Sequence, residues 1–303
     1  MPELPDVEVY VERLEALVGG SPLERLRVAA PWVLRTYDPP PEELEGRTLA
    51  GVTRLGKRIV LEFDGDRHAV IHLMVAGRLR WRAPGYAIPK TRGLAAFDFS
   101  AGTVLFTEEG KTKRASLHLL RGRDGLAEHD RGGLEPIGAD PAAFTAALRR
   151  ERHTLKRSLT DPRLFAGIGW AYSDEIMHRA RVSPIARTDR LTDEQVAALH
   201  EATTTVLTEW VERLREEAGD GFPEKVTAFH PEMAVHGRYR QPCPACGEPV
   251  QRVVLSESEF NYCARCQTEG RILADRALSR LLREDFPRTL EEWERLVPKP
   301  PPA

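Results

Sequence analysis

The sequence has little cysteine and no excess of either charge. Its 303 residues contain four cysteines, all between Cys243 and Cys266, which excludes a disulfide framework spread along the chain. Lys plus Arg number 44 against 46 Asp plus Glu, without the basic excess typical of nucleic-acid-binding proteins. No apolar run reaches about 18 residues, and the first residues lack the basic and apolar regions of a secretory signal. We therefore expect a cytoplasmic protein with no membrane partner.

The near-zero formal charge of −2 conceals an uneven distribution. Residues 111–163 hold twelve basic and seven acidic residues, whereas residues 193–220 hold eight acidic and two basic ones. Solvated surface is the simplest interpretation of such blocks, and a nucleic-acid groove is the alternative. Since 41% of the residues are hydrophobic, the chain is long and apolar enough for about two folded domains.

The first part of the chain is expected to be one helix followed by strands. Apolar residues at helical spacing predict a helix over residues 7–18, with Asp6 as its cap and Gly19 at its end. Short β-rich runs then alternate with turns, as in a β-sandwich or barrel. The clearest runs are Arg58–Phe63, Ala69–Leu73 and Thr103–Phe106.

The second part is expected to be helical. Between residues 140 and 219 the apolar period is that of helices, and Thr192 with Gln195 fits a capping box. Residues 221–242 show no sustained period, and another helix is predicted over Leu273–Leu282. The proline-rich end of the chain is expected to be disordered.

The cysteines form two pairs with the spacing of a zinc ribbon. The ligand set would be Cys243, Cys246, Cys263 and Cys266. Two CxxC knuckles separated by sixteen residues match a four-thiolate site, which leaves no open position for water. We expect one structural zinc ion; a redox dithiol pair or a chance spacing is the alternative. The hairpin between the pairs, Val250–Tyr262, carries Arg252 and would be a finger able to touch a phosphate backbone.

The N-terminus offers a possible nucleophile. Pro2 is a small residue of the kind after which the initiator Met1 is normally removed, and removal would expose a secondary amine. An α-amine has a pKa of about 7.7 to 8.0, so part of it is neutral near pH 7 and can attack a carbonyl. Glu3 is the adjacent carboxylate and could act as a general acid and base. The alternative is that the prolines only stiffen the approach to the first helix.

Several motifs together resemble the formamidopyrimidine-DNA glycosylase and endonuclease VIII family. They are Met1–Glu8, Gly56–Arg58, His72-Leu73, Gly167–Gly169 with Tyr172 and Asp174-Glu175, and Val235–Arg238 before the cysteines. The resemblance implies an α+β fold: an N-terminal β-sandwich domain with flanking helices, a helix-two-turn-helix domain and a C-terminal zinc-ribbon finger. It implies domains at 1–130, 131–235 and 236–268, a C-terminal extension at 269–303, and DNA bound in the cleft between the two larger domains.

The same resemblance implies a monomeric bifunctional DNA glycosylase and abasic-site lyase that acts on damaged or abasic DNA. Pro2 would attack the deoxyribose C1′ atom, Glu3 would assist sugar opening and elimination, and Lys57 would hold a phosphate near the lesion. The DNA-binding candidates are His72, Lys111, Lys113, Arg114, Trp170, Tyr172, Arg238 and Arg252. For Lys57 and His72 the alternatives are a solvated lysine and a packed strand histidine.

Some positions depart from the family pattern. Where members that recognise oxidised purines have an arginine and phenylalanine loop, this chain has Glu108–Arg114 and no aromatic wedge. Met74 lies one residue before the usual wedge position, which is Val75, and a strand would turn it to the opposite face. Trp170 replaces the usual asparagine, and Ser258 the arginine of the finger.

These departures matter because extruding a base costs a few kcal/mol of stacking. We therefore expect abasic-site lyase activity with weak or altered excision of 8-oxoguanine. Two further hypotheses remain open: a noncatalytic protein of this fold that binds damaged DNA, and a zinc-ribbon accessory domain on an unrelated enzyme.

Overall fold

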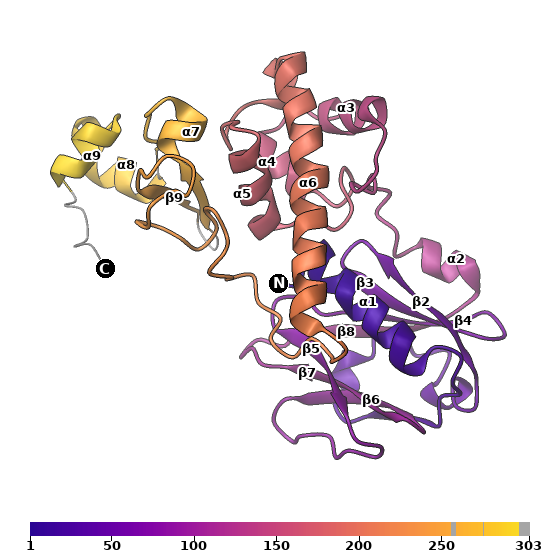
Figure 1. Ribbon diagram of the computed structural model, residues 1–303. Coiled ribbons are helices and arrows are strands. Elements are labelled where there is room, and N and C mark those ends of the chain that lie inside the picture. Colours follow the sequence, from indigo (N-terminus) through magenta and orange to yellow (C-terminus); the bar gives the residue numbers. More distant parts are fainter. Residues whose placement is uncertain (256–258, 275, 297–303) are drawn as a thin grey trace. The chain divides into compact units, whose positions relative to one another are not determined.

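The computed structural model describes residues 1–255, 259–274 and 276–296, and it divides into two compact units (Figure 1). Unit 1 contains Met1–Gly133 and Thr208–Ala228, and unit 2 contains Leu134–Leu207 and the chain from Phe229 onward. The long helix α6 (Asp193–Ala218) contributes residues to both units. In the described part of the chain, no helix is both long and apolar enough to cross a membrane.

Unit 1 is a β-sandwich with a helix at its start. One antiparallel sheet has the order β1 (Arg25–Val28), β6 (Gly93–Phe99), β7 (Gly102–Glu108) and β5 (Gly77–Arg82). The other has the order β2 (Leu49–Leu55), β3 (Arg58–Phe63), β4 (Arg67–His72) and β8 (Ser116–Arg121). Alternate residues such as Ile59, Ile71 and Leu117 are fully buried in the shared core. The predicted β-sandwich is confirmed.

Helix α1 (Leu4–Val18) begins one turn earlier than its apolar period indicates. Glu3 is its N-cap and Asp6 is the third helical residue, so the prediction that Asp6 caps the helix is wrong. The reason is Pro5, because proline fits the first turn of a helix, where its missing N–H costs nothing. The short helix α2 (Gly122–Ala127) follows β8.

Unit 2 combines helices with the cysteine module. Its helices are α3 (Pro141–Arg149), α4 (Leu155–Thr160), α5 (Trp170–Arg179) and the first part of α6. The predicted capping box at α6 is confirmed, because Thr192 and Gln195 each accept a hydrogen bond from the other's backbone N–H. The finger consists of β9 (Val250–Val254), β10 (Glu259–Cys263) and α7 (Ala264–Thr268).

The C-terminal extension packs on the finger. It contains α8 (Arg276–Leu282) and α9 (Leu290–Leu296), so the helix predicted from Leu273 begins three residues later. Leu273 itself lies in a small core around the β-hairpin. Members of that core from the finger are Val253, Phe260, Tyr262 and Ala264, with Phe286, Leu290 and Trp293 of the extension packed against it. Ser258, Asp275 and the proline-rich tail at 297–303 lie outside the described residues.

Candidate active site and nucleic-acid interface

The start of the chain is held in place by helix α1. Pro2 is buried, and Glu3 is only 2% exposed. The Glu3 backbone N–H donates to Asp6 Oδ2 at 2.8 Å, and the Glu3 carboxylate accepts from the Asp6 backbone N–H. This reciprocal capping box satisfies two N–H groups that a helix start otherwise leaves without partners. It also places a carboxylate directly beside the α-amine.

Burial and neighbouring charges set the protonation of this site. Burial lowers the pKa of the α-amine, here on Met1, below its usual value of 8.0, and the cations Arg78 and Lys57 lower it further. Glu3 and Asp6 act in the opposite direction. Burial raises the pKa of Asp6 to about 7, and Asp6 Oδ1 has no hydrogen-bond partner. The site therefore holds an amine that is readily neutral and a carboxyl group that is readily protonated.

Lys57 lies next to this site, in the two-residue turn between β2 and β3. Its charge lowers the pKa of both the α-amine and His72, so it is close to both groups. His72 is half-buried at the end of β4, opposite Arg58 of β3. Burial lowers the pKa of His72 to about 4. The structure thus brings Pro2, Glu3, Lys57 and His72 into one region of unit 1.

The loop after β7 is organised by Glu108, which is 1% exposed. Its Oε1 atom accepts hydrogen bonds from the backbone N–H groups of Arg114 and Ala115, and its carbonyl accepts from Lys113 Nζ. Lys111 and Arg114 are exposed. Glu108 therefore closes a loop in which Lys113 is held by a hydrogen bond and only Lys111 and Arg114, among the basic residues, are exposed.

The segment after β4 differs from the sequence prediction. Residues 74–76 form a turn and not a strand, and Met74 has a φ of +53°. The strand-alternation argument for Met74 is therefore wrong. Val75, where the resemblance leads us to expect the wedge, is nevertheless 60% exposed.

In unit 2, a buried lysine ties α4 to α5. Lys156 Nζ donates to Asp174 Oδ1 at 2.5 Å, to Ser173 Oγ at 2.8 Å and to the Trp170 carbonyl at 2.6 Å. Asp174 Oδ2 accepts from His236 Nδ1 at 2.8 Å and from the Asn261 backbone N–H at 3.0 Å. A single carboxylate therefore joins the helices, the segment before the finger and the finger itself.

Glu175 completes this junction. Its carboxylate accepts three backbone N–H bonds of 2.7 to 2.9 Å, from Ala234, Val235 and His236. Burial raises its pKa, and these bonds oppose that shift. Gly237 continues the clamp, since its N–H donates to Asn261 Oδ1 at 2.8 Å.

The finger offers fewer surface groups than its sequence indicates. Phe260, Asn261 and Tyr262 are all buried, so these side chains are not available to a ligand. Arg252 remains exposed, with its guanidinium 4.4 Å from the centre of the Tyr239 ring and 3.4 Å from Glu259.

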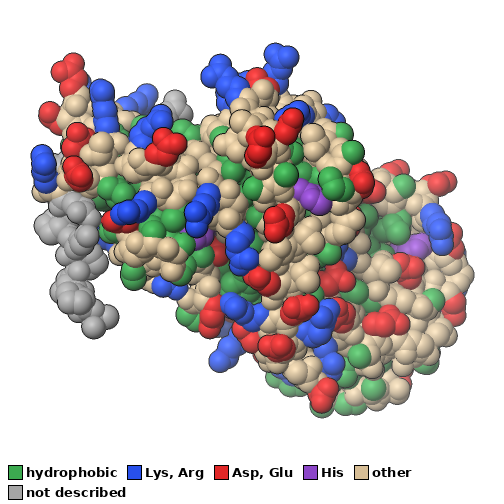
Figure 2. Space-filling model, turned by 45° about the horizontal axis from the view of Figure 1, so that its top comes forward, with side chains coloured by type: hydrophobic (Ala, Val, Ile, Leu, Met, Phe, Trp, Pro, Cys, Tyr) green, Lys and Arg blue, Asp and Glu red, His purple; other side chains and the backbone are tan. Residues whose placement is uncertain are grey.

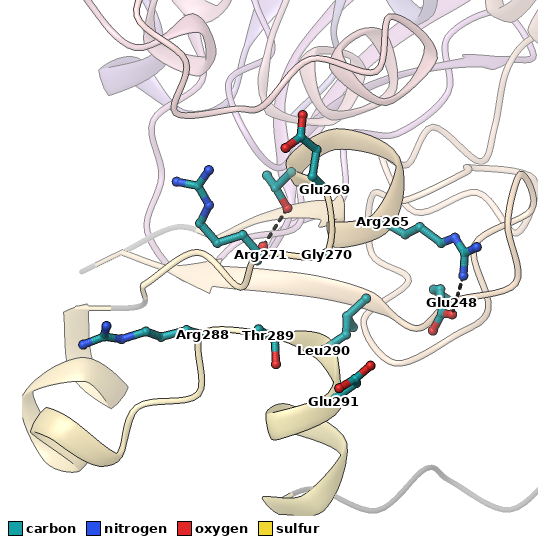
Figure 3. Close-up of a pocket in the computed structure, with 10 residues that line it drawn as sticks. Glu248, Arg265, Glu269, Gly270, Arg271, Arg288, Thr289, Leu290 and Glu291 are labelled. Carbon is teal, nitrogen blue, oxygen red and sulfur yellow. Dashed lines mark hydrogen bonds and ion pairs between the residues drawn. The ribbon is translucent and has the colours of Figure 1, made fainter.

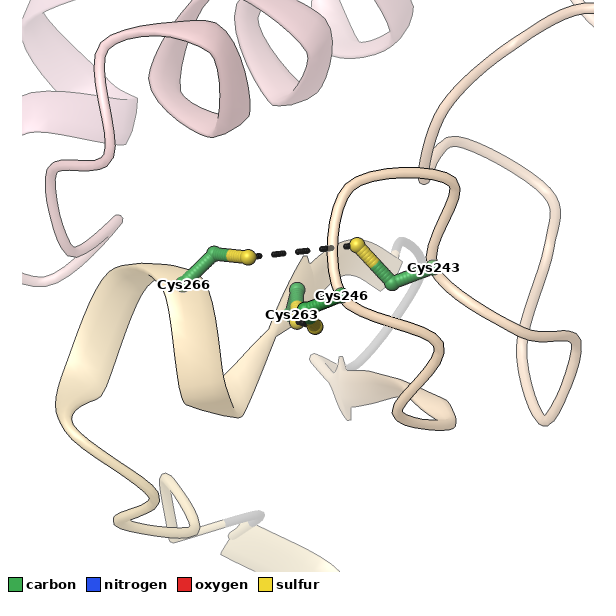
Figure 4. A group of neighbouring side chains, drawn as sticks. All are labelled: Cys243, Cys246, Cys263 and Cys266. Carbon is green, nitrogen blue, oxygen red and sulfur yellow. Dashed lines mark hydrogen bonds between the residues drawn. The ribbon is translucent and has the colours of Figure 1, made fainter.

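The four cysteines converge on one point. Their sulfur atoms all lie within 4.8 Å of one another, with Cys243 and Cys266 at 3.9 Å and Cys246 and Cys263 at 3.4 Å (Figure 4). Zn–S bonds of about 2.3 Å in a tetrahedron require S–S distances of about 3.8 Å, so the cluster fits a metal ion of this kind. His178 Nε2 lies 3.2 Å from Cys243 Sγ and can donate to its thiolate.

Comparisons with known proteins match this architecture. The formamidopyrimidine-DNA glycosylase N-terminal domain model matches residues 1–115, and the H2TH domain model of the same enzyme matches residues 133–219. A formamidopyrimidine-DNA glycosylase of Thermus thermophilus is 34% identical over 281 residues, covering 89% of this chain and all of the relative. The chain belongs to the formamidopyrimidine-DNA glycosylase family. This is a family of DNA-repair glycosylases.

Solved structures agree on the fold. The crystal structure of the Thermus thermophilus family member is 32% identical with a TM-score of 0.74, covering 88% of this chain and 98% of that one. A Lactococcus lactis family member, solved with DNA containing an abasic site, has a TM-score of 0.76 at 24% identity and covers 88% and 99%. The expected α+β family fold is confirmed.

The structure shows what surrounds Trp170, the residue that the sequence analysis finds in place of an asparagine. Its ring lies 4.8 Å from Lys156 Nζ and packs against the finger core that the extension also contacts. Tyr172, two residues later, is 1% exposed inside α5. Arg238 is half-buried and donates to the Pro231 carbonyl. Trp170 and Arg252 therefore keep more exposed surface than Tyr172.

The extension lies beyond both family-model matches and forms a groove with the finger. The groove has a volume of about 820 Å³, and Arg265 in it points toward Glu248 at 3.2 Å (Figure 3). Arg271 and Arg288 point away from that pair (Figure 3). Acidic and basic side chains are mixed in this groove and on the face drawn in Figure 2. Neither place therefore shows a large excess of one charge.

Sequence reasoning missed several groups that the structure brings together. Lys156 and His178 carried no recognisable motif. Asp174 and Glu175 were noticed as a motif without a role. Their partners lie 18 to 87 residues away, and no local pattern reports such distances.

Proposed function

We propose that the protein is a base-excision repair enzyme with DNA glycosylase and abasic-site lyase activities, both through the amine of Pro2. The observation that carries the proposal is the buried start of the chain in a family sandwich domain, where burial lowers the pKa of the Met1 α-amine and the Glu3 carboxylate acts on it. We expect the same burial to favour the neutral form of the Pro2 amine once Met1 is removed. This arrangement supplies a nucleophile and a general acid and base at one point.

In the glycosylase step, the Pro2 nitrogen forms a bond to C1′ of the damaged nucleotide and the bond from C1′ to the base breaks. The base leaves with the bonding electron pair and takes up the proton that the Pro2 nitrogen loses after it has bonded to C1′. Glu3, as the acid, delivers a proton to the ring oxygen when the sugar opens. The product is an iminium ion between C1′ and the Pro2 nitrogen.

In the lyase step, the Glu3 carboxylate, which has given its proton to the ring oxygen, removes a C2′ proton, and the iminium ion accepts the electrons of that C–H bond. The C3′–O bond then breaks, and the 3′ phosphate leaves with that electron pair. Because a secondary amine gives a permanently cationic iminium, no further proton is needed to make it an electron sink. Water finally hydrolyses the enzyme–sugar bond and regenerates the amine.

We propose that Lys57 and His72 bind phosphates beside the attacked sugar. The wider DNA contact would involve the exposed Lys111, Arg114 and Arg252 directly. Lys113 and Arg238 would act through the loops that they hold, and Trp170 and the buried Tyr172 would position α5. The partner is damaged or abasic DNA, as in the Lactococcus lactis complex.

Zinc is the ion we propose for the cysteine cluster. With Cys243, Cys246, Cys263 and Cys266 as four thiolate ligands, the ion would be structural and would stabilise the finger. We further propose functional boundaries at 1–130, 131–235, 236–268 and 269–303, a monomeric state, and action on the nucleoid in the cytoplasm.

Abasic sites are the substrate that we expect to be cleaved best. No aromatic wedge occurs in the Glu108–Arg114 loop, and Val75 offers a small exposed side chain for filling the duplex. An abasic site has no base to unstack, so it avoids a few kcal/mol of extrusion cost. Excision of 8-oxoguanine opposite cytosine should therefore be much slower than abasic-site cleavage, and rapid excision would contradict this preference.

Borohydride trapping tests the mechanism. Protein whose first residue is verified by mass spectrometry is mixed with DNA carrying one abasic site, and reduction should join protein and DNA covalently. A variant with one extra residue before Pro2 should form no adduct, while its affinity for uncleavable abasic DNA stays within about twofold. An undiminished adduct in that variant would refute Pro2 as the nucleophile. Binding without any adduct in the verified wild type would instead support a noncatalytic damage-binding protein.

A further inference from the structure

A cluster of basic side chains covers part of the sheet next to Lys57. Arg58 on β3 pairs with His72 on β4, and His72 pairs with Ser116 on β8. His118 lies two residues after Ser116, so its side chain is on the same face as His72. The opposite face carries the core of the sandwich. On this face α2 packs against β4 and β8, Val60, His68 and Val70 are buried, and Arg58, His72 and His118 are half-buried.

Two more groups reach this face from the chain after α2. The His129 ring lies 4.5 Å from the His118 ring, edge to face. Arg131 is exposed, and its charge lowers the pKa of Arg58, His72 and His129. We call Arg58, His72, His118, His129 and Arg131 the basic cluster.

The basic cluster has little acidic charge near it among the described residues. Within the described chain, none of its five members makes an ion pair or hydrogen bond with a carboxylate. The charged groups that act on the three imidazoles are Arg35, Lys57, Arg58, Glu128 and Arg131, and only Glu128 is acidic. Burial, followed by these cations, lowers the pKa of His72 and of His118 to about 4. The charges of the cluster at neutral pH are therefore those of Arg58 and Arg131, and a bound anion would favour the protonated form of the nearby imidazoles.

We propose that the basic cluster binds a DNA backbone phosphate beyond the one held by Lys57, and that its histidines take up protons when the phosphate binds. The inference rests on the proposed DNA-repair function and extends its DNA-binding surface along β3, β4 and β8. A phosphodiester stays anionic at any pH between 6 and 8, so only the protein side of the contact can titrate in that range.

Proton uptake on binding would make the affinity for DNA depend on pH. If a histidine is neutral in the free protein and charged in the complex, affinity rises by up to tenfold for each pH unit lost. Wild-type protein should therefore bind a duplex with an uncleavable abasic analogue about tenfold more tightly at pH 6 than at pH 8. The doubly substituted variant His118→Gln/His129→Gln should lose most of this ratio.

The matched control is His153→Gln, a half-buried histidine outside the cluster that pairs with Glu151 at 2.7 Å. It should keep the wild-type pH ratio. A second variant, Arg131→Gln, changes an exposed side chain of the cluster. In this variant the slope of log affinity against log salt concentration should be shallower by about one, because one phosphate contact is lost.

A wild-type pH ratio in His118→Gln/His129→Gln, or an unchanged salt slope in Arg131→Gln, would overturn the proposal. Thermal melting must show that each variant is folded as wild type. Cleavage is not required in these measurements, so they remain valid if the Pro2 mechanism fails.

Discussion

The start of helix α1 and the junction between helix α5 and the finger both bury carboxylates, but they treat them differently. At α1, Asp6 Oδ1 is buried without a hydrogen-bond partner, and the pKa of Asp6 is raised to about 7. At the junction, both oxygens of Asp174 and of Glu175 accept hydrogen bonds. The first arrangement leaves a group free to exchange a proton, and the second uses its groups to hold chain segments together.

This difference indicates that one region carries the reacting groups and that the other holds chain segments in place. An unsatisfied buried carboxyl group costs stability, and such costs are typical of functional sites. A fully satisfied buried network instead makes the chain segments it joins more rigid. We therefore assign the reacting groups to unit 1, and to the junction in unit 2 the task of fixing α5, the preceding segment and the finger in one arrangement.

Of the changes that should affect the two regions differently, metal removal should have the largest effect. Zinc binding to a four-cysteine site contributes on the order of 10 kcal/mol to folding. Chelation should therefore remove about one ion per chain and strongly weaken DNA binding. Hydrogen exchange should show lost protection in β9 and β10, with α1 unchanged. Equal loss of protection in α1 would show that the finger also supports the active-site region.

Asp174→Ala should give the next largest effect. It leaves the Lys156 ammonium buried without its carboxylate, and breaking a buried pair in this way costs about 3 to 5 kcal/mol. Denaturant unfolding followed by tryptophan fluorescence is suitable, since the Trp170 ring lies 4.8 Å from Lys156 Nζ. The double variant Lys156→Met/Asp174→Leu is the control and should lose clearly less stability. If the single and double variants lose the same amount, the ion pair is not what the junction depends on.

Asp6→Asn should change the free energy of unfolding by less than Asp174→Ala does, and it should raise stability where Asp174→Ala lowers it. An acid whose pKa is higher in the folded state keeps its proton there while the unfolded chain releases it, so wild-type stability falls as pH rises from about 4 to 7. Asparagine cannot ionise. Relative to wild type, the variant should gain about 3 kcal/mol between pH 5 and pH 8, at about 1.4 kcal/mol per pH unit below the folded-state pKa.

Measuring the free energy of unfolding of both proteins across this pH range reports on Asp6 and the α-amine on which its charge acts, because groups away from this site titrate equally in both. A constant difference would mean that Asp6 has an ordinary pKa and that the α1 region does not hold a proton near neutral pH.

How far the sequence predicts each region depends on the distance between partners along the chain. Pro2, Glu3 and the CxxC pairs were identified because their partners are neighbours or follow a known spacing. Asp6 was misplaced by only one turn, since apolar period alone does not show where a proline-containing first turn begins. The strands were found because the two-residue alternation is local.

The contacts of the junction could not be predicted, because the residues that form them are far apart along the chain. Asp174 joins groups 18, 62 and 87 residues away, and those contacts exist only once the finger folds against α5. Trp170 illustrates the point: the sequence shows a lost amide, whereas the structure shows a ring placed over Lys156 and against the finger core.

Glu175→Gln gives the smallest expected change and is the closest counterpart of Asp6→Asn, because each replaces a buried carboxylate by its amide. The Glu175 carboxylate accepts from Ala234, Val235 and His236, so an amide must turn its NH₂ group toward at least one of these donors. That conflict should cost about 2 kcal/mol. Unlike Asp6→Asn, the variant should therefore be less stable than wild type at pH 8, as measured by denaturant unfolding. A gain in stability would show that burial outweighs hydrogen bonding at both carboxylates and would remove the distinction between the two regions.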